Sequence, residues 1–375
     1  MDRVLHDAAH IAIFLPSLRG GGAERAMLIF AEGLVKLGVK VDLIVVQAQG
    51  PLLEVVPSEV RLINLGKSRM LHALCALWRY LRVEKPQALY STIVHTNIAA
   101  LIAGRLSFTG VKVIVRESNS PLSEVKQGIS RQLMHRLTPW VYPFAHRVIA
   151  VSEGVAEELR QLNRSFKRQI AVLPTPVITA RFYELAEQDC PHPWLQNSPS
   201  NVILAAGRFV VQKDFKTLVA AFASVEQRFP EARLIILGEG PLRGQLESQI
   251  KALNLESKVA LPGFVQNPLP FMKRARLFVL SSLHEGMPNV LVQALALGTP
   301  VVATDCKSGP RECLQDGAFG TLVKVGDVDG LAQAIDDSWN SVVEQSALDY
   351  CQRTYSAEAA AANYLQLIDV ACAPA

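Results

Sequence analysis

Two kinds of segment alternate along this chain: short apolar runs, and longer amphipathic stretches with helical periodicity. Short runs bounded by turn residues predict strands, and the longer stretches between them predict helices. Strands that alternate with helices indicate parallel sheets with helices on both faces, and because the pattern runs twice we expect two doubly wound α/β domains. The runs that predict strands are residues 10–14, 40–46, 60–64, 88–91, 112–115, 147–151 and 169–173 in the first half, and residues 202–206, 233–237, 258–261, 277–280, 301–303 and 320–323 in the second.

The alternation is interrupted at residues 175–200, which are rich in proline and polar residues. A chain of 375 residues also exceeds what a single core usually holds. We therefore expect an N-terminal Rossmann-like domain at residues 1–180, a second Rossmann-like domain at 181–355 and a C-terminal helix at 356–375. Two such domains that face one another would leave a cleft between them.

Charge and composition exclude several classes of function. The net charge of +4 is mild, so it fits an acidic small ligand and argues against nucleic-acid binding, which needs a concentrated basic stripe. No apolar stretch reaches the ~18 residues that span a bilayer, so any membrane association is expected to be peripheral. The apolar run at residues 11–15 is too short for a secretory signal. We expect a cytoplasmic protein, located at the inner face of the cell membrane if it binds one.

The six cysteines are scattered along the chain. None of them has the CxxC spacing, or the partner histidines, that would predict a zinc site or a redox motif. We expect reduced and mostly buried thiols, and no bound metal.

The segment at residues 281–302 carries the strongest functional signal. It predicts the end of a strand, a loop, and a helix that starts at Pro288 and ends before Gly298. Ligands of open α/β sheets bind beyond the carboxyl ends of the strands, where a helix N-terminus favours an anion such as phosphate. The segment therefore predicts an acid, Glu285, and an anion site on the same ligand. The loop itself consists of His284, Glu285, Gly286 and Met287.

A second polar loop follows the first strand of the second half. Gly207 lets the backbone turn at the strand end, and Arg208 and Lys213 follow on the same loop. Arginine supplies a planar fork and lysine a compact charge, so together they suit a diphosphate and the charge that develops on a phosphate leaving group. The alternative is two solvated surface cations, which the position beside the Glu285 loop argues against.

The loop after the first strand contains three glycines, of which Gly21 and Gly22 are candidates for close backbone approach to a ligand. The loop does not match GxGxxG, and no acid stands at the expected place after the second strand. A dinucleotide fingerprint is therefore poorly supported. A plain flexible turn is the alternative.

Two polar runs follow further strands of the first half. His95 is a candidate general base or sugar-hydroxyl partner, or else a structural histidine at a helix N-terminus. Glu117 is a candidate acceptor contact, with a cap or an ion pair to Arg116 as the alternative. Arg116 and Asn119 complete the candidate acceptor side.

Further strand-end turns are expected to flank a nucleotide base and ribose. They contain Gly238, Phe264 and Val265, although a phenylalanine such as Phe264 is more often a core residue than a stacking platform. Residues 123–140 form a basic amphipathic segment that could lie on an anionic bilayer. A surface helix packed on its own sheet is the alternative.

These motifs together resemble the retaining nucleotide-sugar glycosyltransferases of family 4, also called group 1, which have the GT-B fold. The resemblance covers nearly the whole chain and implies a C-terminal helix that packs back on the N-terminal domain. The motifs that carry it are the loop at residues 20–24, Val151-Ser152-Glu153-Gly154, Gly207-Arg208 with Lys213, Gly238-Glu239-Gly240, Glu285-Gly286-Met287-Pro288-Asn289 and Gly298-Thr299-Pro300-Val301-Val302.

The resemblance also implies roles for individual residues. Arg208 and Lys213 would hold the donor diphosphate, Glu285 would contact the donor sugar, and the N–H groups after Pro288 would hold the distal phosphate. No cofactor or metal is implied, because the cations and the helix N-terminus neutralise the charge. The implied donor site comprises Gly21, Gly22, Gly207, Arg208, Lys213, Gly238, Phe264, Val265, His284, Glu285, Gly286, Met287, Pro288, Asn289, Val290, Leu291 and Gln293.

One residue departs from the family pattern. The position eight residues after Glu285 usually holds a second glutamate that binds ribose, and here it is Gln293. An amide can accept a hydroxyl hydrogen bond but brings no charge to it, so weaker nucleotide binding is expected. On the acceptor side, His95 and the loop at residues 116–119 compete for the catalytic role that a histidine has in many relatives.

The expected function is retaining transfer of a sugar from a nucleotide donor, with a UDP-sugar favoured. The expected acceptor is a lipid-linked glycan in the synthesis of a bacterial cell-surface polysaccharide such as O-antigen. One alternative is a sugar epimerase or phosphorylase of the same fold, which would turn over without an acceptor alcohol. Another is a non-catalytic nucleotide-sugar-binding protein.

Overall fold

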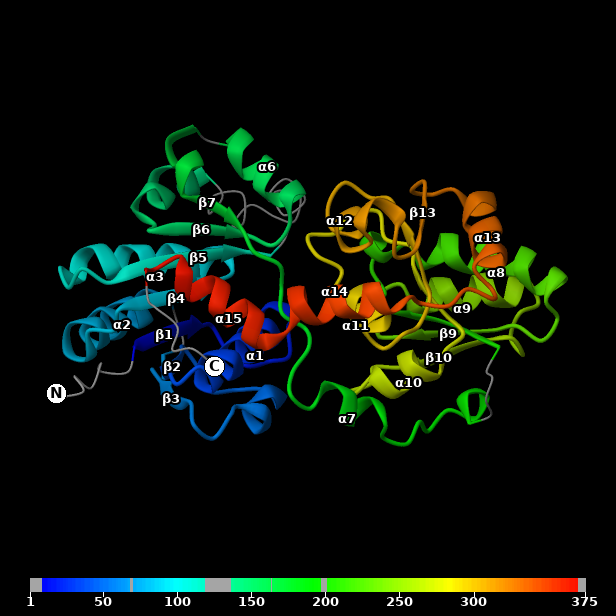
Figure 1. The fold of residues 1–375 in the computed structure, drawn as a ribbon, viewed down its shortest axis with the longest axis horizontal. Helices are drawn as coiled ribbons and strands as arrows, with labels where there is room; N and C mark the ends of the chain where they lie inside the picture. Colours follow the sequence, from blue (N-terminus) through cyan, green and yellow to red (C-terminus); the bar gives the residue numbers. More distant parts are fainter. Residues whose placement is uncertain (1–8, 68–69, 119–135, 163, 197–200, 370–375) are drawn as a thin grey trace. The chain divides into compact units, whose positions relative to one another are not determined.

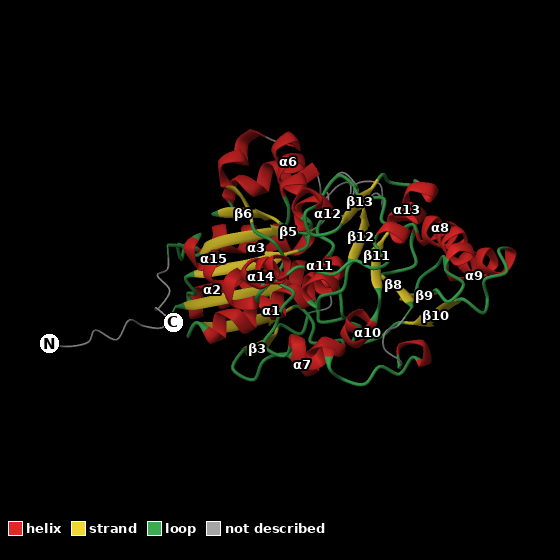
Figure 2. Ribbon diagram, turned by 45° about the vertical axis from the view of Figure 1, so that its right-hand side comes forward, coloured by secondary structure: helices red, strands yellow, loops and turns green. Residues whose placement is uncertain are grey.

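The computed structural model describes residues 9–67, 70–118, 136–162, 164–196 and 201–369. It divides into two units, each with its own sheet (Figures 1 and 2). Unit 1 comprises Met1–Thr179 and Thr354–Ala375, and unit 2 comprises Ala180–Arg353. The sequence predicts these divisions at 180/181 and 355/356, within two residues of where they lie.

Unit 1 is built on a parallel sheet with the strand order β3-β2-β1-β4-β5-β6-β7. Its inner strands are buried and rich in valine and isoleucine, as is usual when helices cover both faces of a sheet, whereas the edge strand β3 is mostly exposed. The strands are β1 (His10–Leu15), β2 (Lys40–Val45), β3 (Arg61–Asn64), β4 (Ala88–Thr92), β5 (Lys112–Glu117), β6 (Arg147–Ala150) and β7 (Ile170–Val172). The main helices are α1 (Gly22–Lys36), α2 (Met70–Glu84), α3 (Val94–Ser107) and α6 (Glu153–Leu162).

Unit 2 repeats this plan with the strand order β10-β9-β8-β11-β12-β13, again all parallel. The strands are β8 (Val202–Ala206), β9 (Arg233–Leu237), β10 (Val259–Gly263), β11 (Leu277–Leu280), β12 (Val301–Thr304) and β13 (Thr321–Val323). The helices are α7 (Phe182–Ala186), α8 (Phe215–Arg228), α9 (Arg243–Ala252), α10 (Leu269–Arg274), α11 (Asn289–Ala296), α12 (Pro310–Cys313), α13 (Val328–Asp337) and α14 (Gln345–Tyr355), which ends in unit 1.

The strand order places one topological switch point in each sheet. Chain order runs outward in one direction from β1 and in the other from β4, and the same holds for β8 and β11. Ligands of open α/β sheets bind in the crevice above such a point, at the carboxyl ends of the two strands. The loops after β1 and β4, and after β8 and β11, are therefore the places to look for function.

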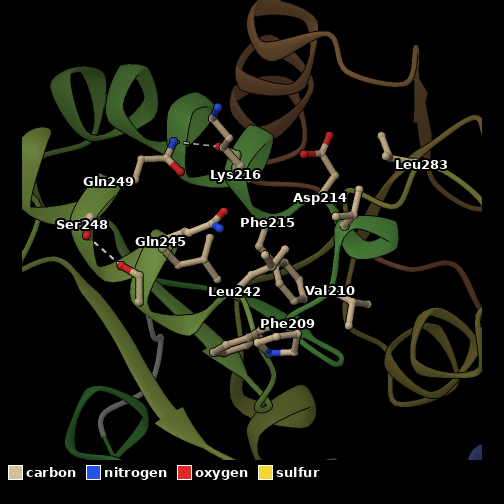
Figure 3. Close-up of a pocket in the computed structure, with 14 residues that line it drawn as sticks. Phe209, Val210, Asp214, Phe215, Lys216, Leu242, Gln245, Ser248, Gln249 and Leu283 are labelled. Carbon is tan, nitrogen blue, oxygen red and sulfur yellow. Dashed lines mark hydrogen bonds between the residues drawn. The ribbon is translucent and has the colours of Figure 1, made fainter.

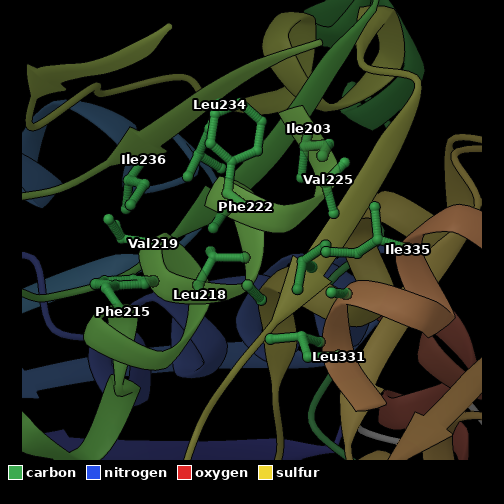
Figure 4. Close-up of a cluster of buried hydrophobic side chains, with 14 of the residues drawn as sticks. Ile203, Phe215, Leu218, Val219, Phe222, Val225, Leu234, Ile236, Leu331 and Ile335 are labelled. Atoms are coloured by element: carbon green, nitrogen blue, oxygen red, sulfur yellow. The ribbon is translucent and has the colours of Figure 1, made fainter. Parts of the chain in front are cut away.

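The core of unit 2 lies between the sheet and the pair α8 and α13 (Figure 4). Apolar residues of α8 recur at helical spacing and turn one face of the helix toward the strands. The residues of this core include Phe215, Leu218, Phe222 and Val225 of α8, Ile203, Leu234 and Ile236 of the sheet, and Leu331 and Ile335 of α13. This core fixes the start of α8, and with it the loop after β8.

The C-terminal helix α15 (Ala357–Gln366) packs against α1, as the sequence analysis predicted (Figure 1). The two backbones approach so closely at Gly33 that a Cβ there would lie 2.1 Å from the carbonyl oxygen of Ala357. The rings of Phe30 and Tyr364 lie in tilted contact with their centroids 4.5 Å apart, and the Tyr90 hydroxyl donates to the Tyr364 carbonyl at 3.0 Å. The aromatic residues thus join α1, β4 and α15 in one core.

Some element boundaries differ from the sequence predictions. The expected helix at the C-terminus begins at Ala357, because Ser356 ends α14 and caps α15 by accepting from the N–H of Ala359 at 3.2 Å. Residues 123–135 of the predicted basic helix lie outside the described residues. In the described ranges, no helix is both long and apolar enough to cross a membrane.

The cysteines in the described ranges are unpaired, in agreement with the prediction of free thiols. Four of them are buried, but Cys75 is exposed on α2.

Candidate active site

The two loops at the switch point of unit 2 meet in an ion pair. Lys213, in the loop after β8, lies with its Nζ 2.5 Å from Oε1 of Glu285, in the loop after β11. The same carboxylate oxygen accepts from the Ser282 hydroxyl at 2.6 Å. The side chains of Lys213 and Glu285 are only 17% and 7% exposed, so the contact is shielded from water and worth more than a surface ion pair.

Main-chain contacts hold the two loops together. The Leu283 N–H donates to the Gln212 carbonyl at 2.8 Å, and the Gln212 side-chain amide donates to the His284 carbonyl at 2.8 Å. The Ser281 hydroxyl donates to the Lys213 carbonyl, also at 2.8 Å. The position of Lys213 relative to Glu285 is thus set by the backbone as well as by the ion pair.

Glycines at the strand ends leave room for this arrangement. Gly207 lies against the side chain of Lys213, where a Cβ would be 3.1 Å from Cε. Gly238, at the end of β9, has φ +138°, and a Cβ there would lie 1.9 Å from the Gly207 carbonyl oxygen. Only glycine satisfies both demands at position 238. The role of Gly238 is therefore explained by its close packing against the backbone of Gly207, without any contact with a ligand.

Arg208 supplies a second cation at the same edge. Its side chain is exposed, and within the ranges that the structure describes it forms no salt bridge and no side-chain hydrogen bond. Lys213 is held by an acid, whereas Arg208 is free to pair with an incoming anion. The two cations predicted from the sequence are therefore close along the chain but differ in pairing: Lys213 already has an acidic partner, and Arg208 has none among the described residues.

Helix α11 begins beside the Glu285 loop, with Pro288 as its N-cap. The prediction placed Pro288 one residue further in, at the first helical position. Among the described residues, the Val290 N–H has no acceptor, and the buried Oδ1 of Asn289 has no donor. An unoccupied N–H at a helix N-terminus is suited to a phosphate oxygen. Gln293 follows one turn later and is half-buried.

The loop after β12 supports the Glu285 loop from a third strand, which the sequence analysis did not anticipate. The Thr304 hydroxyl donates to the Ser282 carbonyl at 2.6 Å. Gly309, at φ +91°, lies so close to Pro288 that a Cβ would be 2.6 Å from its Cδ. A glycine followed by a proline at residues 309–310 is the signal that could have indicated this tight contact.

Cys306 lies in the same loop and is 3% exposed. Burial raises the pKa of its thiol to about 12, with a smaller contribution from the charge of Glu285, while its hydrogen bond with Ser308 acts in the opposite direction. The thiol is therefore protonated at neutral pH. It contacts the segment that carries the acid but is not a nucleophile.

The loop after β10, which is expected at a nucleotide base, differs from the sequence prediction at Phe264. Phe264 is 74% exposed, so its interpretation as a core residue is wrong, and the alternative as a stacking platform stands as a prediction. Val265 beside it is half-buried. Both follow β10, two strands away from β8 in the sheet.

A pocket of about 780 Å³ lies between the starts of α8 and α9 (Figure 3). Its lining includes the apolar side chains of Phe209, Phe215 and Leu242, with Lys216 and Gln245 among its polar residues. None of the predicted donor residues lines it. The pocket is a neighbour of the candidate site and not part of it.

The switch point of unit 1 has a different character. The N–H groups of Gly20 and Gly21 both donate to Oε2 of Glu24, at 2.9 and 3.0 Å, and the Ser17 hydroxyl donates to its other oxygen at 3.0 Å. Of the two candidate glycines Gly21 and Gly22, only Gly21 has its N–H taken by Glu24. Gly21 is the N-cap of α1, both Gly21 and Gly22 are exposed, and their contact with a donor stays a prediction.

His95 follows β4 and lies in the first turn of α3, so it is at this switch point as the prediction requires. It is half-buried. The preceding Ile93 has φ +74°, which is a strained conformation for a β-branched residue. Such strain is retained only where the surroundings enforce it, and here it sets the start of the helix that carries His95.

Arg116 and Glu117 are used inside unit 1. The Tyr142 hydroxyl donates to the Glu117 carboxylate, and the Asn97 amide donates to it at 3.1 Å. Arg116 is 2% exposed and donates to the Thr175 hydroxyl, and burial lowers its pKa. The expectation of direct acceptor contact is corrected for both residues, because their side chains face the interior. Asn119 lies outside the described residues.

No group of three or more histidine, cysteine, aspartate or glutamate side chains that could hold a metal occurs in the described ranges.

The molecule thus has two parallel Rossmann-like sheets, with an acid, two cations and a helix N-terminus at the switch point of the second. Residues 20–181 match the family described as Glycosyltransferase Family 4, and residues 200–341 match the family described as Glycosyl transferases group 1. The chain belongs to this family, which has the GT-B fold.

Curated relatives support this assignment. The chain is 32% identical over 204 residues to an uncharacterized glycosyltransferase of Methanocaldococcus jannaschii, a match that covers 54% of this chain and 50% of the relative. It is 29% identical over 337 residues to N-acetylgalactosamine-N,N'-diacetylbacillosaminyl-diphospho-undecaprenol 4-alpha-N-acetylgalactosaminyltransferase of Campylobacter jejuni, covering 87% of this chain and 88% of that protein. These relatives identify glycosyl transfer as the activity of the class.

Solved structures show the same fold at low sequence identity. A glycosyltransferase from Rickettsia africae superimposes with a TM-score of 0.79 at 17% identity, covering 97% of this chain and 98% of that one. HepE of Anabaena, in complex with UDP and glucose, superimposes with a TM-score of 0.74 at 17% identity, covering 96% and 98%.

Proposed function

We propose that this protein transfers a sugar from a nucleoside diphosphate donor, with UDP favoured, to a hydroxyl group of a lipid-linked glycan. The transfer proceeds with retention of the anomeric configuration and without a metal. The observation that carries the proposal is the buried Lys213–Glu285 pair, which lies at the switch point of unit 2 beside the unpaired Arg208 and the start of α11.

The donor diphosphate is neutralised by groups of the chain. An ammonium group has three donors, so Lys213 can keep its contact with Glu285 and give a second hydrogen bond to a phosphate oxygen. Arg208 supplies a planar fork to the same diphosphate, and the Val290 N–H supplies a third donor. With the phosphates in this place, the donor sugar lies toward Glu285.

In the reaction, the bond between the anomeric carbon and the donor phosphate oxygen breaks, and its electron pair stays on the phosphate. The acceptor oxygen forms the new bond on the same face of the sugar, and its proton passes to the leaving phosphate oxygen. Arg208, Lys213 and the α11 N-terminus stabilise the negative charge that develops there. Glu285 lies where positive charge develops on the sugar.

The nature of the substrates rests on relatives. HepE binds UDP and glucose in its solved complex, and the Campylobacter relative is named for a diphospho-undecaprenol acceptor. A lipid-linked acceptor for the present chain requires access to a membrane from its cytoplasmic side. Residues 123–140 are one proposed contact with anionic lipid, and of the described part Leu137 and Trp140 are 42% and 77% exposed.

Gln293 modifies donor binding in this proposal. It follows Asn289 by one turn of α11, so both side chains project from the same side of the helix. An amide at this position pairs with a ribose hydroxyl without charge. We therefore expect Gln293→Glu to tighten UDP binding and to leave the rate of transfer at saturating donor unchanged.

A thermal-shift screen of UDP-, GDP- and ADP-sugars tests the donor. A ligand at a hundred times its dissociation constant stabilises the folded chain by about 2.7 kcal/mol, which is readily measured. We expect the largest shift with a UDP-sugar, and the shift should fall in Arg208→Gln but not in Lys216→Gln, whose exposed lysine lies on α8. Equal shifts with all three nucleotides would exclude the preference for UDP.

Product analysis tests the reaction. With a lipid-linked acceptor, NMR of the product should show the anomeric configuration of the donor, and an inverted centre would exclude retention. Turnover that does not require an acceptor alcohol would favour an epimerase or phosphorylase. Absence of all turnover, with donor binding that is normal in Glu285→Ala, would favour a non-catalytic sensor.

A further inference from the structure

Several large apolar side chains of unit 1 are exposed near the amino ends of the strands in its sheet. Trp78 and Val83 belong to the last turns of α2, and Leu106 and Phe108 belong to the end of α3 and its C-cap. Phe144 ends the short turn before β6. Their exposed fractions are 36%, 70%, 51%, 86% and 56%, respectively. Isolated exposed apolar residues are ordinary, but a gathered set marks an interaction surface.

Direct contacts link three of these residues to one another or to neighbouring arginines: Trp78, Leu106 and Phe144. The Trp78 indole N–H donates to the Leu106 carbonyl at 3.1 Å, which ties the end of α2 to the end of α3 (Figure 1). The guanidinium of Arg82 lies 5.3 Å from the Trp78 ring centroid. That of Arg105 lies 5.7 Å from the ring of Phe144. The five apolar residues with these two arginines are called the aromatic edge below.

The aromatic edge lies at the amino ends of the strands. Helix α2 ends at Glu84, shortly before β4 starts at Ala88, and α3 ends at Ser107, shortly before β5 starts at Lys112. Phe144 likewise precedes β6. The switch-point loops lie at the carboxyl ends of the same strands. The aromatic edge is therefore separate from the candidate site, and the mechanism does not use it.

The charge around the aromatic edge is positive. Arg79, Arg82, Lys85 and Arg105 are exposed, and in the part of the chain that the structure describes none of them forms a salt bridge. The acid of the last turn of α2, Glu84, is already paired with Arg61 at 3.0 Å. A surface of aromatic and aliphatic side chains with unpaired cations among them is complementary to an anionic bilayer.

We propose that the aromatic edge is a docking surface for an anionic lipid bilayer. Phe108, Val83 and Phe144 enter the interfacial region, and the four cations contact the lipid phosphates. Trp78 and Leu106, which are hydrogen-bonded to each other, form the rigid centre. A second copy of this chain is a poorer occupant, because it would oppose the same cations across the interface. The proposal does not depend on the donor or on the transfer reaction.

Flotation of the full chain with extruded vesicles tests the docking surface. One set contains phosphatidylcholine with about 30 mol% phosphatidylglycerol, and the other contains phosphatidylcholine alone. We expect binding to the anionic vesicles only, and weaker binding as salt is raised. Removing one cation near a membrane surface costs about fivefold in partitioning, so Arg82→Gln with Lys85→Gln should weaken binding by about 25-fold.

Matched variants test the apolar part. Val83→Ser with Phe108→Ser should weaken binding at least tenfold, by an estimate of about 25 cal/mol per Å² of apolar surface. Val55→Ser in unit 1 and Val342→Ser in unit 2 are the controls, because these valines are 55% and 86% exposed and lie outside the aromatic edge. All four changes are at exposed positions, and circular dichroism checks that each variant is folded.

Several results would overturn the proposal. Equal binding to both vesicle types, or none to either, excludes an anionic-lipid surface. Undiminished binding in both double variants places the membrane contact elsewhere, for instance at residues 123–140. A dimer by light scattering that Phe108→Ser dissociates assigns the edge to a second copy, and equally tight binding of a single-stranded oligonucleotide assigns it to nucleic acid.

Discussion

The two switch points of this molecule have the same topology and different chemistry. In unit 2 the loops after β8 and β11 bring together Lys213 and Glu285, and among the residues that the structure describes Arg208 has no ion-pair partner and one N–H of α11 has no acceptor. In unit 1 the corresponding glycine loop is closed by Glu24, which accepts from two of its amides. Topology thus supplies a crevice twice, and the loop residues decide which crevice can take an anion.

The largest effect is expected from removing the buried cation of unit 2. Lys213→Met leaves Glu285 without its ionic partner and removes one donor to the leaving phosphate. We expect kcat/KM to fall by about 10²–10³-fold. The matched control is Lys216→Met, because Lys216 is exposed and forms no salt bridge in the described ranges. Steady-state kinetics with a UDP-sugar measures both, and an equal loss in both variants would remove the special role of Lys213.

The next effect concerns the glycines under the two loops. Gly238→Ala would place a methyl group 1.9 Å from the Gly207 carbonyl at φ +138°, so we expect unfolding free energy to fall by about 3 kcal/mol. Gly22→Ala meets nothing within 4 Å and should change stability by less than about 1 kcal/mol. Urea denaturation of the two variants compares the crevices directly. If Gly238→Ala and Gly22→Ala lose the same unfolding free energy, steric contact at the glycine does not distinguish the loops of unit 2 from those of unit 1.

A smaller effect is expected at Cys306, whose buried thiol donates to the Ser308 carbonyl at 3.8 Å, in the loop that packs against the segment of Glu285. Cys306→Ala should lower kcat by about tenfold with little change in KM for the donor, because a displaced acid is costly in the transition state. Cys306→Ser should restore most of the rate. Cys351→Ala is the control, since Cys351 is buried and its thiol pKa is raised to about 12 by burial alone. A parallel loss in the control would indicate a packing effect.

The smallest effect is expected in unit 1. Glu24→Ala opens the glycine loop and should cost about 1 kcal/mol of stability through loss of the cap. Donor affinity should be unchanged, because the loop does not bind the diphosphate in this scheme. Isothermal titration with UDP gives the answer, and a large loss of affinity would assign the donor contact to Gly21 and Gly22 after all.

The sequence predicted the parts of the site that depend on local order along the chain. Periodicity identified the strands, and the carboxyl ends of parallel strands necessarily share one edge, so Lys213 and Glu285 were expected together although 72 positions separate them. Glu24 stands three residues after the N-cap Gly21, which is the spacing of a capping box, but the glycines of the same loop also suggested a ligand contact. Where a motif had two uses, the sequence did not decide between them.

Other features depend on contacts that spacing does not encode. Arg116 and Glu117 were expected in a loop but are the last residues of β5, and Tyr142 and Thr175 contact them from segments whose approach no periodicity specifies. Phe264 is apolar but exposed. Cys306 and Gly309 lie beside the Glu285 segment only because β12 packs next to β11. These contacts required the fold.

The packing of α15 on α1 has a consequence for how the protein is made. Unit 2 is one continuous stretch of chain, whereas unit 1 needs residues from both sides of it. During synthesis, the contacts of Phe30 and Tyr90 with the ring of Tyr364 cannot form until the C-terminal residues have left the ribosome. The same holds for the close packing of Gly33 against the backbone of Ala357. Unit 1 therefore begins to be synthesised first, but its folding can be completed only after that of unit 2.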